Sequence, residues 1–267
     1  MWGLMRWKHG LDEGRTRIMR CLKSSGGTDI KAILFDIDGT ILRCQGAGKR
    51  SLERAALEVF GTTGAMDTVH FQGKTDPWII YASLEPAGFA REEIAGRMEA
   101  LKERYFSHLR RFIREVDVTL LPGIRALVGE LQADEDTVVG LLTGNFIEGA
   151  RIKLGVFDLF SSFTMGVYGD DAEVRNEMPA IAREKIRALS GDAPGFDEML
   201  VIGDTVHDVE CGKHSGALTL AVGTGWTPPE ELRARTPDLY FDTLEDTPTV
   251  LAGIRALFRD VEGERAS

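Results

Sequence analysis

Two pairs of aspartates are the residues of this chain whose spacing most clearly suggests chemistry. Asp36 and Asp38 follow the apolar run of residues 32–35, which is typical of a strand buried on both faces of a parallel sheet. Because they are two residues apart, their side chains share a face at the carboxyl end of that strand, where open α/β sheets bind ligands. Asp204 and Asp208 follow a second apolar run and bracket a turn into a helix. The alternative is that these acids only form turns and helix caps.

Three negative charges come together if the two pairs meet, namely those of Asp36, Asp204 and Asp208. Such a cluster is costly unless a cation compensates it. Carboxylate oxygens with retained waters suit Mg²⁺, so the sequence predicts a magnesium site. Gly39 permits a turn directly after the first pair, and Thr40 adds a hydroxyl beside it.

A second strand end also carries polar groups. The apolar residues 138–142 are followed by Thr143, Gly144 and Asn145, and a helix is expected over residues 147–154. The amino end of that helix would direct free backbone N–H groups at whatever Thr143 contacts, which favours an anionic ligand.

The cation that would accompany these groups is less clearly marked. Basic residues near the end of the next expected strand are Arg175, in the acidic segment of residues 170–177, and Arg183 and Lys185 on the following helix. Arg175 could instead be a surface arginine paired with neighbouring acids, which would contribute little.

The elements that must position these residues alternate between strand and helix, which predicts an α/β fold with a doubly wound, Rossmann-like parallel sheet. Apolar runs predict the strands, and apolar residues at helical spacing predict the helices. The expected strands are residues 32–35, 138–142, 163–167, 199–202, 218–222 and 239–241, and the expected helices are residues 124–131, 147–154, 181–189 and 250–258.

Residues 45–116 interrupt this alternation with helical patterns and no strand pattern. One helix is expected from Ser51 to Phe60, a second after Asp76 as the cap and Pro77 as the first residue, and a long third over residues 94–112. A helical block between two strands of a sheet indicates an inserted cap domain. The catalytic core is then expected over residues 30–44 and 117–260.

Residues 1–29 differ from the rest and are expected to be a poorly ordered extension. The segment of residues 1–31 holds seven basic and three acidic residues, whereas the whole chain has a net charge of −10. That acidic balance argues against a nucleic-acid partner, and no apolar run is long enough to cross a membrane. Three cysteines without metal-ligand spacing suit reduced thiols in the cytoplasm, and we expect a monomer or homodimer there.

The ordered set of strand ends resembles the haloacid dehalogenase superfamily over residues 31 to about 245. The segment D-I-D-G-T at residues 36–40 resembles its first motif, L-L-T-G-N at 141–145 its second and G-D-T-V-H-D at 203–208 its fourth. The third motif differs: many relatives have lysine before proline, whereas this chain has R-N-E-M-P at residues 175–179. The segment around Arg175 resembles that of phosphoglycolate-phosphatase-like members, in which arginine replaces this lysine. Those members carry a helical cap of the C1 type. The resemblance therefore implies Arg175 as the first candidate for the cation of the third motif, with Arg183 or Lys185 as the alternative.

The resemblance implies a Mg²⁺-dependent phosphatase that acts through an aspartyl phosphate. Asp36 would attack phosphorus, and Asp38, holding a proton among neighbouring carboxylates, would protonate the leaving oxygen and then activate water. The metal would be held by carboxylate oxygens of Asp36 and Asp204 and by the backbone carbonyl of Asp38, with Asp208 as a ligand or a support. The transferring oxygens would be bound by Thr143, Gly144, Asn145 and Arg175.

Two other functions compete with a phosphatase. A phosphomutase of the same superfamily uses the same pair of acids and differs in cap residues that return the phosphoryl group to the substrate. A non-catalytic phosphate-binding protein would not need Asp36, Asp38, Thr143, Asp204 and Asp208 together. Asp38 with Thr40 favours phosphate-ester chemistry, and we expect a small phosphorylated metabolite as substrate.

The cap is expected to select that substrate. Gly73 permits a close approach to the core and Lys74 offers a charge, although Lys74 could equally be a solvated loop lysine. Cys44 lies near the first pair of acids, but without an adjacent base motif it is expected to be a small buried residue and no nucleophile.

Overall fold

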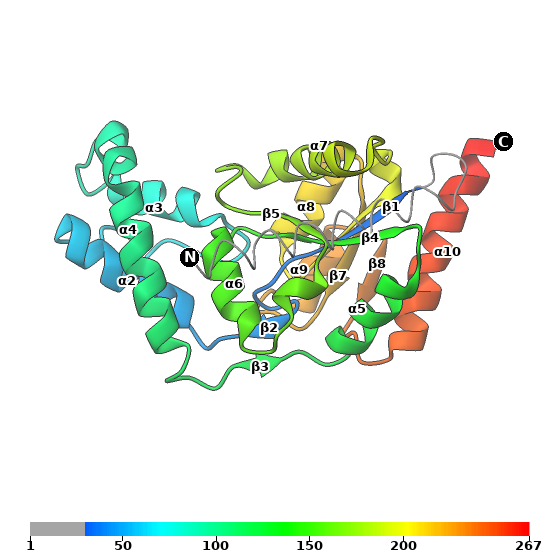
Figure 1. Cartoon of the computed structure of the whole chain (residues 1–267), viewed down its shortest axis with the longest axis horizontal. Coiled ribbons are helices and arrows are strands. Elements are labelled where there is room, and N and C mark those ends of the chain that lie inside the picture. The colour runs from blue at the N-terminus through cyan, green and yellow to red at the C-terminus, as the bar shows by residue number, and fades with distance from the viewer. Residues whose placement is uncertain (1–29, 267) are drawn as a thin grey trace.

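The computed structural model describes residues 30–266, so the predicted extension of residues 1–29 lies outside the described part (Figure 1). Within that part, six parallel strands form one sheet in the order β5-β4-β1-β6-β7-β8. Strand β1 (Lys31–Phe35) lies between β4 (Thr137–Leu142) and β6 (Met199–Gly203). The predicted α/β fold with a parallel sheet is therefore confirmed. The outer strands are β5 (Met165–Val167), β7 (Leu218–Val222) and β8 (Leu239–Phe241).

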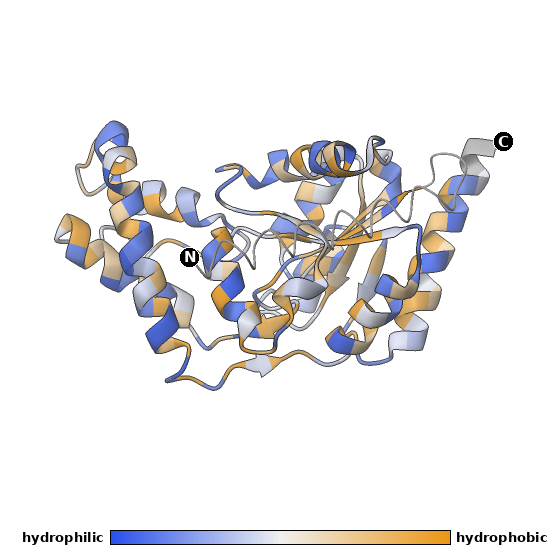
Figure 2. Ribbon diagram, in the orientation of Figure 1, coloured by the Kyte–Doolittle hydropathy of each residue, from blue (hydrophilic) through white to orange (hydrophobic). Residues whose placement is uncertain are grey.

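Both faces of the sheet are buried, and alternate residues of each strand serve different faces. In β1, Ile33 and Phe35 belong to one apolar cluster, whereas Ala32 and Leu34 belong to another on the opposite face. Figure 2 shows the strands as predominantly hydrophobic and the surrounding helices as mixed. This two-sided burial explains why the strands read as continuous apolar runs in the sequence.

Helices cover both faces of the sheet. Helices α5 (Ile124–Ala133) and α10 (Thr247–Ala266) contribute to the first cluster, and α7 (Met178–Ser190) with α8 (Val206–Ser215) to the second (Figure 1). Two more helices, α6 (Ile147–Gly155) and α9 (Pro229–Ala234), complete the core. Short 3₁₀ turns occur at Phe160–Ser162, Arg175–Glu177 and Phe196–Glu198.

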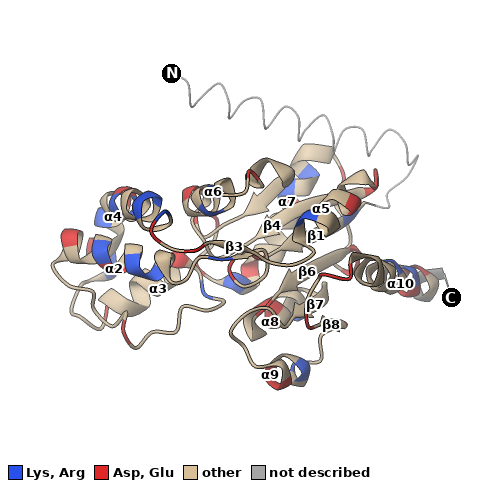
Figure 3. Cartoon of the chain, turned by 90° about the horizontal axis from the view of Figure 1, so that it is seen from below, with Lys and Arg blue, Asp and Glu red and all other residues tan. Residues whose placement is uncertain are grey.

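Three helices between β1 and β4 lie together at one end of the sheet, on the left in Figure 1. They are α2 (Ala47–Phe60), α3 (Asp76–Leu84) and α4 (Arg91–Phe112). The chain enters them through β2 (Leu42–Arg43) and leaves through β3 (Thr119–Leu120), and these two strands pair antiparallel. Figure 3 shows charged residues of both signs along α2 and α4, as expected for amphipathic helices.

Packing between α4 and α6 fixes this helical block against the core. Tyr105 and Phe106 of α4 meet Phe146 with ring centroids 6.4 and 6.2 Å apart. On the surface, Lys102 pairs with Asp170 at 2.7 Å. The helical block therefore covers the carboxyl edge of the sheet near β4.

The start of α3 differs from the prediction. Thr75, and not Asp76, is the N-cap, since its hydroxyl accepts a hydrogen bond from the N–H of Trp78 at 3.2 Å. Asp76 is instead buried and turned toward the core, where its Oδ2 accepts a hydrogen bond from the N–H of Phe146 at 2.8 Å. The prediction missed this because an acid before proline is also a good local cap.

None of the helices in the described residues combines the length and the apolar character needed to span a bilayer.

Candidate active site

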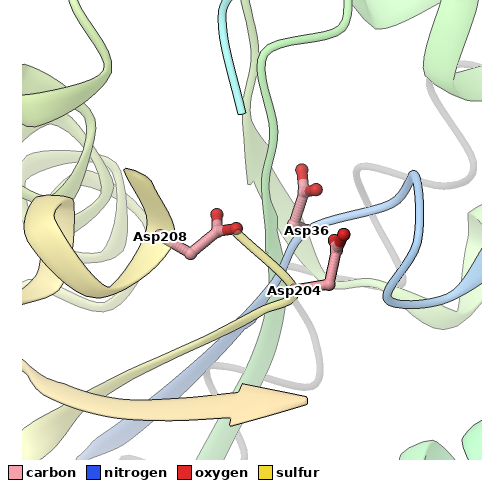
Figure 4. A group of neighbouring side chains, drawn as sticks. All are labelled: Asp36, Asp204 and Asp208. Atoms are coloured by element: carbon pink, nitrogen blue, oxygen red, sulfur yellow. The ribbon is translucent and has the colours of Figure 1, made fainter. Parts of the chain in front are cut away.

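Three buried carboxylates meet at the carboxyl edge of the sheet (Figure 4). Asp36 follows β1, Asp204 follows β6, and Asp208 lies in the first turn of α8. One carboxylate oxygen of each lies within 4.8 Å of one from each of the others. Asp36 therefore meets Asp204 and Asp208, as their places at neighbouring strand ends predict.

The surrounding chain orients Asp204 and Asp208. The Thr40 hydroxyl, which follows the first pair of acids, donates to Asp204 Oδ1 at 3.0 Å. Thr205 donates to Asp208 Oδ2 from its backbone N–H at 2.9 Å and from its hydroxyl at 2.6 Å, in a capping box that starts α8. Gly39 has a φ of +91°, and a side chain there would collide with the Asp204 carboxylate.

This carboxylate cluster fits a divalent cation. Among the described residues, Asp204 Oδ2 has no hydrogen-bond partner although it is buried. Burial raises the pKa of Asp36 to about 6 even though Arg175 opposes the shift. Burial and the charges of Asp208 and Asp36 raise the pKa of Asp204 well above its ordinary range. A hard cation would relieve both effects, and the oxygen donors are those that Mg²⁺ prefers.

Within residues 30–266, Arg175 is the cation that reaches the cluster. Its Nη2 lies 3.2 Å from Asp36 Oδ1 and also pairs with Asp208 Oδ1, and its guanidinium is buried. The alternatives point elsewhere, because Arg183 donates to the carbonyl of Pro194 at 2.8 Å and Lys185 pairs with Asp171 at 2.6 Å. Geometry thus favours the first candidate for the third-motif cation.

Thr143 is fully buried beside Asp36, and its hydroxyl opposes part of the rise that burial causes in the pKa of Asp36. Its Oγ1 accepts hydrogen bonds from the side chain of Asn145 at 2.9 Å and from the Asn145 N–H at 3.4 Å. The Asn145 amide therefore supports Thr143. The carbonyl of Gly144 accepts a hydrogen bond from the N–H of Asp76 at 2.7 Å, so the loop before α3 touches the second motif.

Asp38 has surroundings that the sequence did not predict. Its Oδ2 accepts hydrogen bonds from Lys153 Nζ at 2.5 Å and from Asn145 Nδ2 at 2.8 Å. Burial raises the pKa of Asp38, but Lys153 and Asn145 outweigh it and the pKa is lowered overall. We expected Asp38 to hold a proton among carboxylates, whereas these donors favour its ionised form.

Lys153 is the functional candidate that sequence reasoning missed. It is buried in α6, and its Nζ also donates to Asn145 Oδ1 at 2.6 Å. The available signal was its position: Lys153 lies three residues after buried Ala150 and beside buried Leu154, on the apolar face of the helix. A lysine at such a position needs a partner.

A cavity of about 400 Å³ separates this edge of the sheet from the helical block. Its walls include Gly73 and Lys74, as well as Lys49, Phe71 and Trp226. The loop that carries Gly73 crosses the carboxyl edge closely.

Gly73 has a φ of +69°, and a Cβ there would lie 2.6 Å from Thr205 Oγ1. Its carbonyl accepts a hydrogen bond from Arg175 Nη1 at 3.3 Å. The expected close approach of Gly73 is therefore present, whereas the Lys74 ammonium lies 4.7 Å from the centre of the Trp78 ring, at the cavity wall.

Cys44 is buried with its Sγ 3.5 Å from Asp38 Oδ1. Burial raises the pKa of its thiol to about 11, so it is a protonated packing residue at neutral pH.

Comparison with known proteins points to one family. The sequence pattern that describes the haloacid dehalogenase-like hydrolase family matches residues 30–216 of this chain. A phosphoglycolate phosphatase from Pectobacterium atrosepticum is 23% identical over 225 residues, which cover 82% of this chain and 91% of that protein.

Solved structures share the fold. A hydrolase from Pseudomonas syringae matches with a TM-score of 0.64 at 21% identity, covering 84% of this chain and 99% of that one. A β-phosphoglucomutase from Clostridium difficile matches with a TM-score of 0.63 at 16% identity, covering 87% of this chain and 98% of that one. The resemblance inferred from the motifs is confirmed: this chain belongs to the haloacid dehalogenase-like hydrolase family and is an enzyme of that family.

Proposed function

We propose that this enzyme is a phosphatase that hydrolyses a small phosphorylated metabolite through an aspartyl phosphate on Asp36. The observation that carries the proposal is the unlike surroundings of the two neighbouring acids. Asp36 lies against Arg175 at the carboxylate cluster, whereas Asp38 faces the cavity and is held by Lys153 and Asn145. Two carboxylates in unlike environments suit a nucleophile and a separate acid or base.

Asp36 attacks phosphorus in the first step, and the bond to the leaving oxygen breaks. Lys153 and Asn145 favour the ionised form of Asp38 in the free enzyme, so Asp38 first takes up a proton as the substrate binds and then passes it to the leaving oxygen, and an alcohol departs. In the second step Asp38 removes a proton from water, which attacks the phosphorus of the aspartyl phosphate and regenerates Asp36. Arg175 and the Thr143 hydroxyl stabilise the charge on the transferring oxygens, supported by their positions beside Asp36.

Mg²⁺ bound by carboxylates of Asp36 and Asp204 and by the Asp38 carbonyl would neutralise charge on the phosphoryl oxygens. Both oxygens of Asp208 already accept hydrogen bonds from Arg175 and Thr205, which supports a role for Asp208 in orienting Arg175.

The substrate is proposed to be a small phosphate ester with a polar or anionic leaving group. The cavity of about 400 Å³ is in the range of small-ligand sites, and Lys49 and Lys74 lie in its wall. Phosphoglycolate is the first compound to test, because the relative from Pectobacterium atrosepticum is named for it.

The test is phosphate release from a panel of phosphorylated metabolites with Mg²⁺, together with mass spectrometry of acid-quenched enzyme. We expect release of inorganic phosphate and a phosphoryl adduct on Asp36. Conversion of a sugar phosphate into its isomer without phosphate release would replace the phosphatase by a phosphomutase. Stoichiometric binding of the esters without turnover would overturn the catalytic proposal.

A further inference from the structure

Lys153 is a buried cation in the cavity wall to which the two-step chemistry gives no role. Only 5% of its side chain is exposed, and its Nζ lies among polar atoms of Asp38 and Asn145. A lysine is among the residues least often buried, because removing its charge from water is unfavourable without partners. Its position therefore calls for a reason beyond packing.

The two carboxylate oxygens of Asp38 have different hydrogen-bond partners. Asp38 Oδ2 accepts both strong hydrogen bonds, from Lys153 and from Asn145. Asp38 Oδ1 is contacted by the weak thiol donor of Cys44 at 3.5 Å. One oxygen is thus anchored by two nitrogen donors, and the other keeps lone pairs for a proton that enters from the cavity. The Asp38 side chain is 31% exposed, which makes it reachable from the cavity.

Lys153 also determines which way the Asn145 amide faces. An ammonium can only donate, so the atom of Asn145 at 2.6 Å from Lys153 Nζ must be its oxygen. The amide nitrogen must then face the other way, where it donates to Asp38 Oδ2 at 2.8 Å and to Thr143 Oγ1 at 2.9 Å. The single charge of Lys153 therefore orders Asp38 directly and again through Asn145.

We infer that Lys153 is a positioning residue that holds the free oxygen of Asp38 toward the leaving group of the substrate. The inference rests on the proposed phosphatase function, in which Asp38 passes a proton to the leaving oxygen. Lys153 acts through Asp38, so its effect depends on how much the leaving group needs that proton. Alkoxides need it most, whereas a nitrophenolate leaves readily without it.

The variant Lys153→Met keeps the length of the side chain and removes the charge. We expect kcat/KM to fall by about 10²-fold or more for an alkyl phosphate and by less than about 10-fold for 4-nitrophenyl phosphate, in line with the usual size of acid–base assistance. A purely structural role would lower both rates by the same factor. Lys213→Met, which changes a lysine on the exposed side of α8, should leave both rates unchanged.

The double variant Asp38→Asn/Lys153→Met separates the role from a folding defect, because neither charge is left buried without a partner. Since Lys153 acts through Asp38, adding Lys153→Met to Asp38→Asn should lower kcat/KM for the alkyl phosphate by less than about 3-fold, measured at equal folded fraction. A loss as large as in the wild-type background would overturn the inference.

A crystal structure of metal-free Lys153→Met gives a readout that needs no activity. Asp38 is expected to leave its present orientation or to occupy more than one. An unchanged Asp38 together with equal losses on both esters would overturn the role of Lys153 while the phosphatase function stands. A wild-type enzyme that releases phosphate from neither ester and from no metabolite of the panel would overturn the proposed function and, with it, this inference.

Discussion

Arg175 Nη2 lies 3.2 Å from Asp36 Oδ1, and the same nitrogen pairs with Asp208. One guanidinium therefore compensates two of the three carboxylates that meet at the carboxyl edge of the sheet. The third, Asp204, receives a hydrogen bond from Thr40 at one oxygen, while its other oxygen has no partner among the described residues. This division of partners places the guanidinium on the Asp36 side, whereas the Asp204 side has no compensating positive charge among the described residues.

The variant Arg175→Ala should lower kcat/KM by roughly two to three orders of magnitude, comparable to the loss of one preorganised donor at the transition state. Without the guanidinium, the pKa of Asp36 should rise further, because the charge that opposes burial is gone. Steady-state kinetics at several pH values would measure both effects. Arg175→Lys should restore part of the rate, since it keeps the charge but not the fork that also reaches the Gly73 carbonyl.

Matched controls for this prediction are Arg183→Ala and Lys185→Ala. Both side chains contact other parts of the core, so their removal should change kcat/KM by less than about 3-fold. If Arg175→Ala were silent and one of the controls inactive, the cation would have to come from α7.

Removal of divalent metal should abolish turnover, and Mg²⁺ should restore it. Ca²⁺ should substitute poorly, because its longer bonds and higher coordination number displace the carboxylate that attacks phosphorus. Mg²⁺ should also raise the unfolding temperature by relieving repulsion among Asp36, Asp204 and Asp208. Activity assays and thermal unfolding with and without chelator would test this. Full activity in excess chelator would contradict the magnesium site.

Asp36→Asn should abolish turnover while the fold persists, because an amide cannot attack phosphorus. Removing this buried charge should not lower the unfolding temperature, since burial already disfavours the charged form. Asp260→Asn, in the exposed part of α10, is the control and should retain full activity. An Asp36→Asn enzyme with turnover near that of the wild type would remove Asp36 from the role of nucleophile.

The fold could be predicted from the sequence because a parallel sheet buried on both faces leaves unbroken apolar runs. The carboxylates could be predicted for the same reason, since Asp36 and Asp204 interrupt such runs where neighbouring strands end. Arg175 was harder to place, because it lies in a 3₁₀ turn outside any strand or long helix.

Lys153 and Asp76 make contacts that the local sequence pattern does not reveal. Each is a charged residue whose partners lie far away in the chain: Lys153 contacts Asp38, and Asp76 contacts Phe146. Spacing along one helix reveals which face a residue occupies, but the contact itself depends on how α3 and α6 pack against the core. Tertiary contacts thus determine the surroundings of Asp38 and the true cap of α3.

Asp76 should give stability a recognisable pH dependence. Burial raises its pKa from 3.8 to about 6, so the folded state holds a proton that the unfolded state has released between these pH values. Its contribution to stability is therefore fully present below pH 3.8 and is lost as the pH rises through 6.

Asp76→Asn keeps an acceptor for the Phe146 N–H and cannot ionise. Its stability advantage over the wild type should grow by about 1 kcal/mol between about pH 5 and 7.5, as measured by urea unfolding. An advantage that stays constant over this range would show that Asp76 is ionised throughout.

Gly73 and Gly61 provide a matched pair for testing the contact between the Gly73 loop and the carboxyl edge of the sheet. Both have positive φ, +69° and +74°, so alanine at either should cost about 1 kcal/mol of stability through backbone strain. Their surroundings differ, because a Cβ at Gly61 meets nothing within 4 Å whereas a Cβ at Gly73 would lie 2.6 Å from Thr205 Oγ1. Gly73→Ala must therefore move the loop away from Thr205 and from Arg175, and kcat/KM should fall at least 10-fold.

Gly61→Ala should lower the stability of the fold and leave kcat/KM unchanged. Kinetics and thermal unfolding of the two variants would decide, and equal activity in both would mean that the close approach of Gly73 is not needed for turnover.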